Sequence, residues 1–190
     1  AAHVDSHANM WRMVDDVWDA WWYIPHLVEV ASEWDGWIGN GTWPDCDMIP
    51  LGRIFIRGER GEERQSRLTP DEQRTLMTFF AVFRSPLFFG GDLPSMDPFT
   101  LELLTNKEVL RMHRESTGVK LDYVKDGVSV VTSRNSVTGE HYMALINLSD
   151  EEMTYSLPSR ARRGKDLWSG AALRGRKVTL APHASLLVSF

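Results

Sequence analysis

The alternation of helix-like and strand-like segments, which stops near Gly118, most constrains the fold of this 190-residue chain. Before that glycine, segments with helical periodicity alternate with segments of strand character, and loops separate them. After it come short strand-like runs separated by turn residues. Residues 1–118 contain 11 Lys and Arg against 19 Asp and Glu, whereas residues 119–190 contain 10 against 7, so the charge balance changes sign. We therefore predict a domain boundary at about 116–120, between a domain over 1–118 and a second over 119–190.

One helix in the first domain has especially clear end signals. Thr69 and Glu72 have the spacing of a capping box, and Pro70 suits the first helical position. Pro86 disfavours helical geometry in the residue before it, so this helix is expected to end near Ser85.

Three further helices are expected in the same domain. One covers Asp15–Trp22, is interrupted by Pro25 and resumes in "HLVEVASEW". Asp97–Pro98 opens another helix, and Thr105 with Glu108 predicts a capping box for the last one.

Strands are expected near residues 7–11, 44–48 and 86–89, each followed by a helix. Three such β/α units imply parallel strands with crossover helices. A complete eight-unit barrel needs about 250 residues. The pattern therefore fits either a small open sheet or the C-terminal part of a (β/α)8 TIM barrel.

The second domain has the pattern of an antiparallel β-sandwich. Short strands follow one another, and Asp126–Gly127 is a hairpin signal between the first two. We interpret this domain as a stabilising appendage rather than a binding module. Trp168 is accordingly expected in its core, with a sugar-stacking platform as the alternative.

Composition excludes several functional classes. The net charge of -5 disfavours nucleic acids and anionic membrane surfaces as partners, and no apolar run is long enough to span a bilayer. Cys46 is the single cysteine and is interpreted as inert. The spacing of His and Cys residues predicts no metal site, and no phosphate-binding glycine loop is present, so no cofactor is expected.

Acidic residues lie at the C-terminal ends of the expected strands of the first domain, close to aromatic residues such as Trp11 and Trp43. They are Asp15 and Asp16 near Arg12, Asp45 and Asp47 in "WPDCDM", and Asp92. Carboxylates between aromatic rings suit a carbohydrate site, and glycosidic cleavage needs two carboxyl groups that flank the bond. Acids at helix starts are equally typical of structural caps, so composition leaves both interpretations open.

Four segments resemble the latter half of the melibiase-type α-galactosidases, glycoside hydrolase family 27. They are "NMWRMVDDVWDAW", "GTWPDCDMIPLG", "LTPDEQRTLMTFFAVFRSPLFFGGDL" and "TLELLTNKEVLRMH". They follow in the family's order over about residues 7–115, and the tail resembles the family's C-terminal domain more loosely. The resemblance implies a (β/α)8 catalytic barrel followed by an antiparallel β domain, and a retaining hydrolase with two catalytic aspartates.

The resemblance also implies roles for individual residues. The family's acid/base aspartate lies four residues after the arginine of a Trp-Arg pair, which makes Asp16 the catalytic residue and Arg12 a substrate-binding residue. Asp47 becomes a ligand of sugar hydroxyls, with Met48 beside it. Cys46 departs from the family's pattern, because it replaces a proline.

The resemblance places the family's nucleophile well upstream of the Trp-Arg pair, and these residues contain no counterpart. We therefore expect the chain to supply the acid/base half of the site and to be inactive alone. The implied partners are a terminal α-galactoside and the N-terminal half of the barrel, or further copies of this chain. Hydrolysis of terminal α-N-acetylgalactosaminides or β-L-arabinopyranosides is one alternative, and a non-catalytic sugar-binding role is another. Asp15 is the second choice as the acid, and is otherwise expected to be solvated or to cap its helix.

Overall fold

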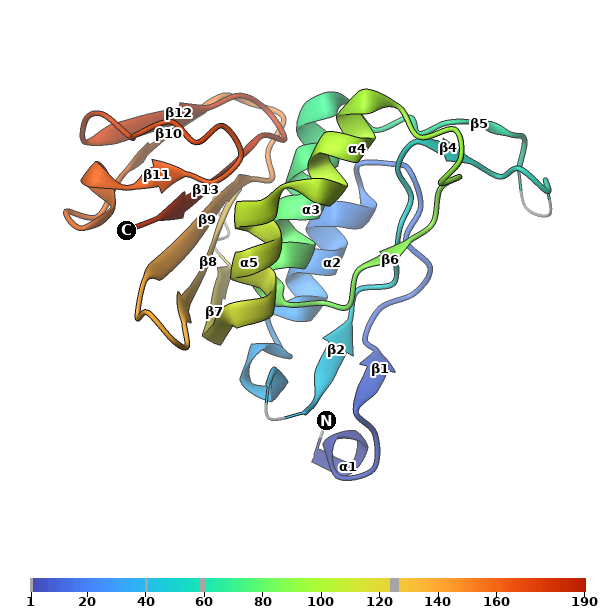
Figure 1. Cartoon of the computed structure of the whole chain (residues 1–190), viewed down its shortest axis with the longest axis horizontal. Helices are drawn as coiled ribbons and strands as arrows, with labels where there is room; N and C mark the ends of the chain where they lie inside the picture. The colour runs from blue at the N-terminus through green and yellow to red at the C-terminus, as the bar shows by residue number, and fades with distance from the viewer. Residues whose placement is uncertain (1, 40, 59–60, 124–126) are drawn as a thin grey trace.

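A computed structural model describes residues 2–39, 41–58, 61–123 and 127–190. From left to right, Figure 1 shows an antiparallel sheet, a group of helices and a set of short strands. Helix α3 lies in the middle and contacts four strands of the large sheet.

The first part of the chain contains the helices and the parallel strands. Its helices are α1 (Ala2–Asp5), α2 (Tyr23–Ala31), α3 (Pro70–Phe83), α4 (Pro98–Thr105) and α5 (Lys107–Glu115), with a 3₁₀ turn at Asp35–Trp37. Its strands are β1 (Met10–Arg12), β2 (Trp43–Asp45), β3 (Met48–Ile49), β4 (Arg53–Ile54), β5 (Arg64–Gln65) and β6 (Phe88–Phe89). β1 pairs with β2 and β3 pairs with β6, in both cases parallel. The strand expected near 44–48 is thus divided between two pairs.

Helix α3 begins as the sequence predicts. The Thr69 hydroxyl accepts from the Glu72 N–H, and the Glu72 carboxylate accepts from the Thr69 N–H at 2.8 Å. The helix ends at Phe83, and Arg84 follows in the left-handed conformation. Every residue from Thr75 to Phe83 is buried, as expected for a helix covered on all sides.

Two helix predictions are wrong. The segment 15–22 contains turns and bends, and α2 begins at Tyr23 with Pro25 in its first turn. Proline is tolerated there because the first N–H groups of a helix have no partner within it. At α5, Asn106 is the cap, accepting from the N–H groups of Glu108 and Val109, while Thr105 ends the preceding helix.

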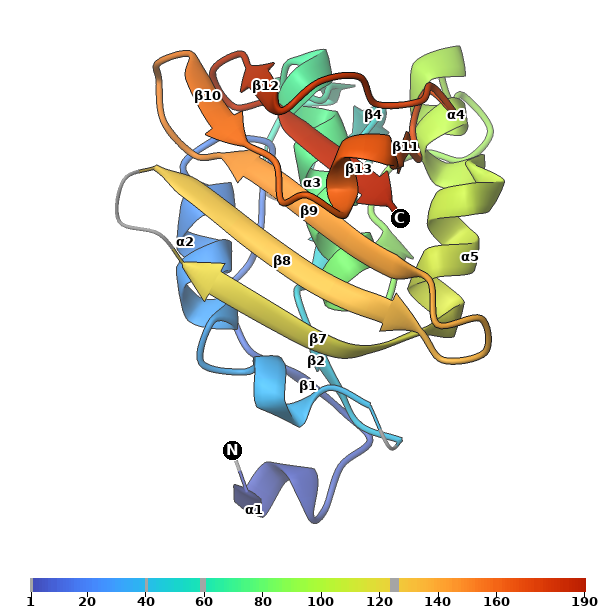
Figure 2. The same ribbon diagram turned by 90° about the vertical axis from the view of Figure 1, so that its left-hand side faces the viewer.

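The second part contains a five-stranded antiparallel sheet in the order β11-β13-β9-β8-β7 and the separate pair β10-β12 (Figure 2). The strands are β7 (Ser116–Tyr123), β8 (Val128–Asn135), β9 (His141–Asn147), β10 (Met153–Ser156), β11 (Lys165–Asp166), β12 (Lys177–Leu180) and β13 (Ser185–Ser189), with a 3₁₀ turn at Ala161–Arg163. Residue 126 of the expected hairpin turn lies outside the described residues.

The central strand β9 is buried on both faces. In β9, Tyr142 and Ala144 pack into the cluster that contains α3, whereas Met143 and Leu145 pack into a second cluster with Leu180. This alternation is the period of a strand between two apolar layers. Trp168 packs against the first cluster, and its indole N–H donates to the Thr78 hydroxyl at 2.8 Å, in agreement with a core position. Among the described residues, no helix has the length and apolar character needed to cross a membrane.

Candidate active site

Arg12 and Asp45 lie side by side at the carboxyl ends of two parallel strands. They are register partners at the ends of β1 and β2. Trp11 is buried while its neighbours Met10 and Arg12 are exposed, because successive strand residues point to opposite faces. The Arg12 guanidinium therefore lies on the face of β1 opposite the buried indole.

The Arg12 guanidinium joins two carboxylates that the sequence analysis selected. Its Nη1 lies 2.8 Å from Asp47 Oδ1, and its Nη2 lies 3.3 Å from Asp16 Oδ1. The side chain of Asp47 is 13% exposed, whereas that of Asp16 is 53% exposed. One carboxylate is thus held within the protein and the other faces solvent, on either side of one cation.

Asp47 is held in an uncommon backbone conformation. Its φ is 78°, in the region that favours glycine, and its Oδ2 accepts from the Val17 N–H at 2.7 Å. Non-glycine residues in this conformation persist where surrounding contacts hold them, and they concentrate at functional sites. The bond to Val17 also fixes the segment after Asp16 against the segment after β2.

The carboxylate of Asp45, two positions before Asp47, is buried. Its Oδ1 accepts from the Asp47 N–H at 3.0 Å. Burial raises the pKa of Asp45, and the Asp47 N–H and the Arg12 charge offset part of that rise. Asp45 therefore supports the turn that presents Asp47.

The neighbouring acids Asp15 and Asp16 have different surroundings. Asp16 contacts Arg12, and both Asp15 and Asp16 are exposed. No helix begins at this segment, so a helix-capping role for Asp15 is wrong.

Asp19 is a buried anchor to which the sequence analysis assigned no role. Its fully buried carboxylate accepts from Arg64 Nη2 at 2.6 Å, from Arg64 Nε at 3.0 Å and from the Arg67 N–H at 3.0 Å. Burial by itself raises the pKa of Asp19, but the bonds from Arg64 and Arg67 outweigh burial and hold the pKa below its usual value. Both arginines are more than 40 positions away in the sequence, so spacing alone could not identify this contact.

Arg12, Asp16 and Asp47 form a charged cluster, which we call the Arg12 cluster. Other candidates lie outside it. Asp92 accepts from Ser95 and lies 3.8 Å from Arg53, so it stabilises the loop after β6. The two aromatic residues expected at the site also face elsewhere. Trp11 packs against Trp34, and the ring of Trp43 lies beneath the Arg84 guanidinium.

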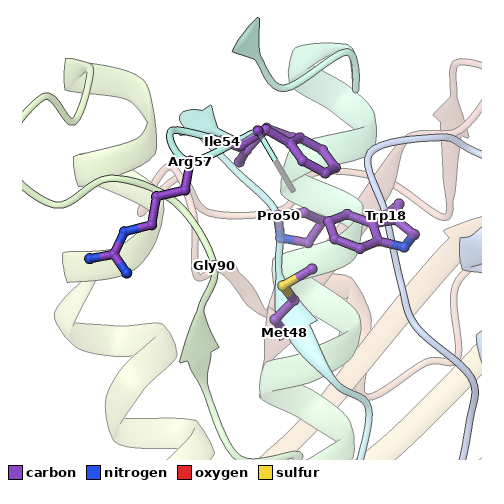
Figure 3. Close-up of a pocket in the computed structure, with 8 residues that line it drawn as sticks. Trp18, Met48, Pro50, Ile54, Arg57 and Gly90 are labelled. Atoms are coloured by element: carbon purple, nitrogen blue, oxygen red, sulfur yellow. The ribbon is translucent and has the colours of Figure 1, made fainter. Parts of the chain in front are cut away.

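A cavity of about 390 Å³ is partly lined by Trp18, and we call it the Trp18 pocket (Figure 3). It is lined by Trp18, Met48, Pro50, Ile54, Phe55, Arg57, Gly58 and Gly90. Met48 is the neighbour of Asp47 and was expected at the site, whereas Trp18 was not selected from the sequence. The signal for Trp18 was its place in the family segment "NMWRMVDDVWDAW", two positions after Asp16.

Cys46 lies between the two site aspartates of "WPDCDM" but does not reach the site. Its side chain is fully buried, burial raises the pKa of the thiol, and its N–H donates to the Ser85 hydroxyl. Within the described part of the chain, no group of three His, Cys, Asp or Glu residues could hold a metal ion.

Comparison with known proteins identifies the family. The family model described as "Alpha galactosidase A" (melibiase) matches residues 2–115. The chain is 30% identical over 117 residues to "Alpha-galactosidase 2" of Arabidopsis thaliana. The aligned residues cover 62% of this chain and 26% of that protein. It is 27% identical over 188 residues to an α-galactosidase of Oryza sativa, which covers 92% of this chain and 42% of the rice protein.

A solved structure is similar over the whole chain. The GH27 β-L-arabinopyranosidase of Geobacillus stearothermophilus superposes with a TM-score of 0.91 at 38% identity, covering 100% of this chain and 47% of that one. The chain thus spans less than half the length of these relatives. The matched residues include β1, β2 and the Arg12 cluster. This chain belongs to the melibiase family of glycoside hydrolases, GH27.

Proposed function

We propose that the chain supplies the acid/base half of the active site of a retaining exo-glycosidase that removes terminal α-linked galactose. The observation that supports this most directly is the Arg12 guanidinium between Asp16 and Asp47. A cation between an exposed and a sheltered carboxylate can orient a sugar hydroxyl while it leaves one acid accessible to the glycosidic oxygen.

The chain corresponds, in this proposal, to the C-terminal part of a (β/α)8 barrel with a β-sandwich domain after it. The parallel pairs β1-β2 and β3-β6 and the helices that follow them support this arrangement. The carboxyl ends of barrel strands carry the active site, and Arg12 and Asp45 lie at such ends. The nucleophile then comes from an earlier strand, outside these 190 residues, with its carboxyl about 5–5.5 Å from that of Asp16.

Each residue has a separate role in the proposed reaction. Asp16 protonates the glycosidic oxygen as the nucleophile forms the glycosyl-enzyme intermediate. The leaving group departs, and the Asp16 carboxylate then takes a proton from the water that hydrolyses the intermediate. Arg12 and Asp47 bind hydroxyls of the sugar, and the Met48 side chain contacts its apolar face.

A second candidate substrate is a terminal β-L-arabinopyranoside. The similarity to the Geobacillus stearothermophilus β-L-arabinopyranosidase over the whole chain favours it. Galactose and this pentose share the arrangement of their ring hydroxyls and differ in the exocyclic hydroxymethyl group. Arg12 and Asp47 can therefore serve either sugar, and discrimination falls to residues near that group.

The test is Asp16→Asn in the enzyme that contains this chain, with Asp15→Asn as the matched control. Asp16→Asn should lower kcat/KM for melibiose by about a hundredfold to ten-thousandfold, the usual contribution of a general acid. The glycosylation step of 4-nitrophenyl α-galactoside should lose less, because nitrophenolate leaves with little protonation. Asp15→Asn should change either rate less than about twofold.

Unchanged hydrolysis of melibiose by Asp16→Asn would contradict the assignment. A large loss in Asp15→Asn instead would move the acid role to that residue. The wild-type kcat/KM for the 4-nitrophenyl derivatives of α-galactose and β-L-arabinopyranose then decides between the two substrates.

A further inference from the structure

The Trp18 pocket has a rigid aromatic wall. The rings of Trp18 and Phe55 stack with centroids 4.7 Å apart and an angle of 20° between their planes. The guanidinium of Arg64 lies 4.4 Å from the centroid of the Phe55 ring, and it also binds the carboxylate of Asp19, the residue after Trp18. Both aromatic rings are therefore positioned before any ligand binds.

The segments that carry Trp18 and Met48 also carry the carboxylates of the site. The bond between the Val17 N–H and Asp47 Oδ2 joins the residue before Trp18 to the residue before Met48. Trp18 and Met48 both line the pocket, and Asp16 is two positions from Trp18. The bond between Val17 and Asp47 thus holds the segments that carry the pocket residues and the carboxylates together.

The pocket offers apolar surface. Trp18, Met48 and Pro50 group together, while Arg57 extends away from the indole (Figure 3). The backbone at Gly90 packs closely against this surface, because a Cβ there would lie 2.8 Å from Met48 Sδ. A galactosyl ring needs polar partners for its hydroxyls, which Arg12 and Asp47 supply outside this apolar surface.

We propose that the Trp18 pocket is the subsite for the leaving group, and that it selects a leaving group with a flat apolar ring face. Such a face belongs to an aromatic aglycone or to one side of a sugar ring, and either stacks on an indole. This inference rests on the proposed function, since Asp16 must protonate the oxygen that joins the leaving group to the sugar.

The experiment compares wild type, Trp18→Ala and Trp18→Phe in the enzyme that contains this chain. Trp22→Ala is the matched control, because Trp22 is 61% exposed and does not line the pocket. The substrates are 4-nitrophenyl α-galactoside, melibiose and methyl α-galactoside. Relative to the methyl glycoside, Trp18→Ala should lower kcat/KM for at least one ring-bearing substrate by about three- to tenfold, the worth of one aromatic contact.

The choice of substrates separates lost stacking from damage to the acid. Methoxide is the poorest leaving group, so impaired proton donation by Asp16 would reduce methyl glycoside hydrolysis most, opposite to the prediction. Trp18→Phe should recover much of the loss, and Trp22→Ala should leave the ratios unchanged. A loss with 4-nitrophenyl galactoside alone identifies an aromatic aglycone, and a loss with melibiose identifies a sugar. Equal effects of Trp18→Ala on all three substrates would overturn the inference.

A binding measurement keeps the two proposals separate. If wild type hydrolyses none of the glycosides, the proposed function fails, and saturation-transfer NMR on the same proteins then tests the pocket. Transfer to the aromatic protons of 4-nitrophenyl α-galactoside should fall in Trp18→Ala but not in Trp22→Ala. Equal transfer in both variants would exclude the pocket as a ring-binding site.

Discussion

Asp19 and Asp45 are both buried, yet their pKa values move in opposite directions. The carboxylate of Asp19 accepts from two arginines, which hold its pKa below the usual value although burial opposes this. Burial dominates at Asp45 and raises the pKa, because a backbone N–H and the Arg12 charge offset only part of the desolvation. Asp19 is therefore a stabilising anion and Asp45 a costly one.

Replacing Asp19 should be strongly destabilising. Asp19→Asn leaves the partly buried Arg64 without its carboxylate, and breaking such a pair costs about 3 kcal/mol of unfolding free energy. Urea denaturation near neutral pH measures this cost. Asp15→Asn is the control, because Asp15 is exposed, and it should change the unfolding free energy by less than about 0.5 kcal/mol.

The pH dependence gives the same prediction an independent check. A carboxyl whose pKa is lowered on folding stabilises the protein above its unfolded-state pKa, about 3.9, and loses that contribution as the pH falls toward the folded-state value. The difference between wild type and Asp19→Asn should therefore shrink below about pH 4. A difference that stayed constant into acid would show that the carboxylate charge is not the cause.

Part of the candidate site could be predicted from the sequence. Arg12, Asp16 and Asp47 were selected through family motifs, and they lie within contact distance. Their catalytic and binding roles stay predictions. The aromatic wall at Trp18 was missed, because it depends on a contact with Phe55 from a segment whose separation in the sequence carries no signal. The support from Asp45 was also missed, although it is a local bond to the N–H two positions later.

The helices were predictable where one cap dominated. Thr69 has Glu72 three positions later and proline between them, so the start of α3 was identified correctly. At α5 two caps competed, and Asn106 prevails because its side chain accepts from two N–H groups while Thr105 completes α4. The expected helix at 15–22 failed because the long-range contacts of Asp19 and Val17 hold that segment in turns.

These two threonines provide a matched test of capping. Thr69→Ala removes the side-chain acceptor at the start of α3 and should cost about 1 kcal/mol of unfolding free energy. Thr105→Ala removes a hydroxyl that donates to the Leu101 carbonyl in the last turn of α4, and it should cost less than about 0.5 kcal/mol. Thermal unfolding followed by circular dichroism measures both. Equal losses would contradict the assignment of the caps.

The hydrophobic core extends through both parts of the chain. Phe79 and Phe83 of α3 share one buried cluster with Val131 of β8 and Tyr142 of β9. His183, from the second part, lies 2.7 Å from Glu72 at the start of α3. The sequence analysis located the change from helices to strands near Gly118 but could not predict this packing, because apolar periodicity identifies a buried face and not its neighbour.

A shared core predicts that the two parts unfold together. Val131→Ala opens a cavity where the sheet meets α3 and should cost about 1–3 kcal/mol, whereas Val137→Ala, at a position 82% exposed, should have no measurable effect. Seven of the eight tryptophans precede Gly118, so fluorescence follows the first part, and amide exchange in β8 and β9 follows the second. In Val131→Ala the free energies from both probes should fall equally. Weaker protection in the sheet with an unchanged fluorescence transition would mean that the parts unfold independently, and that the cluster around α3 does not couple them.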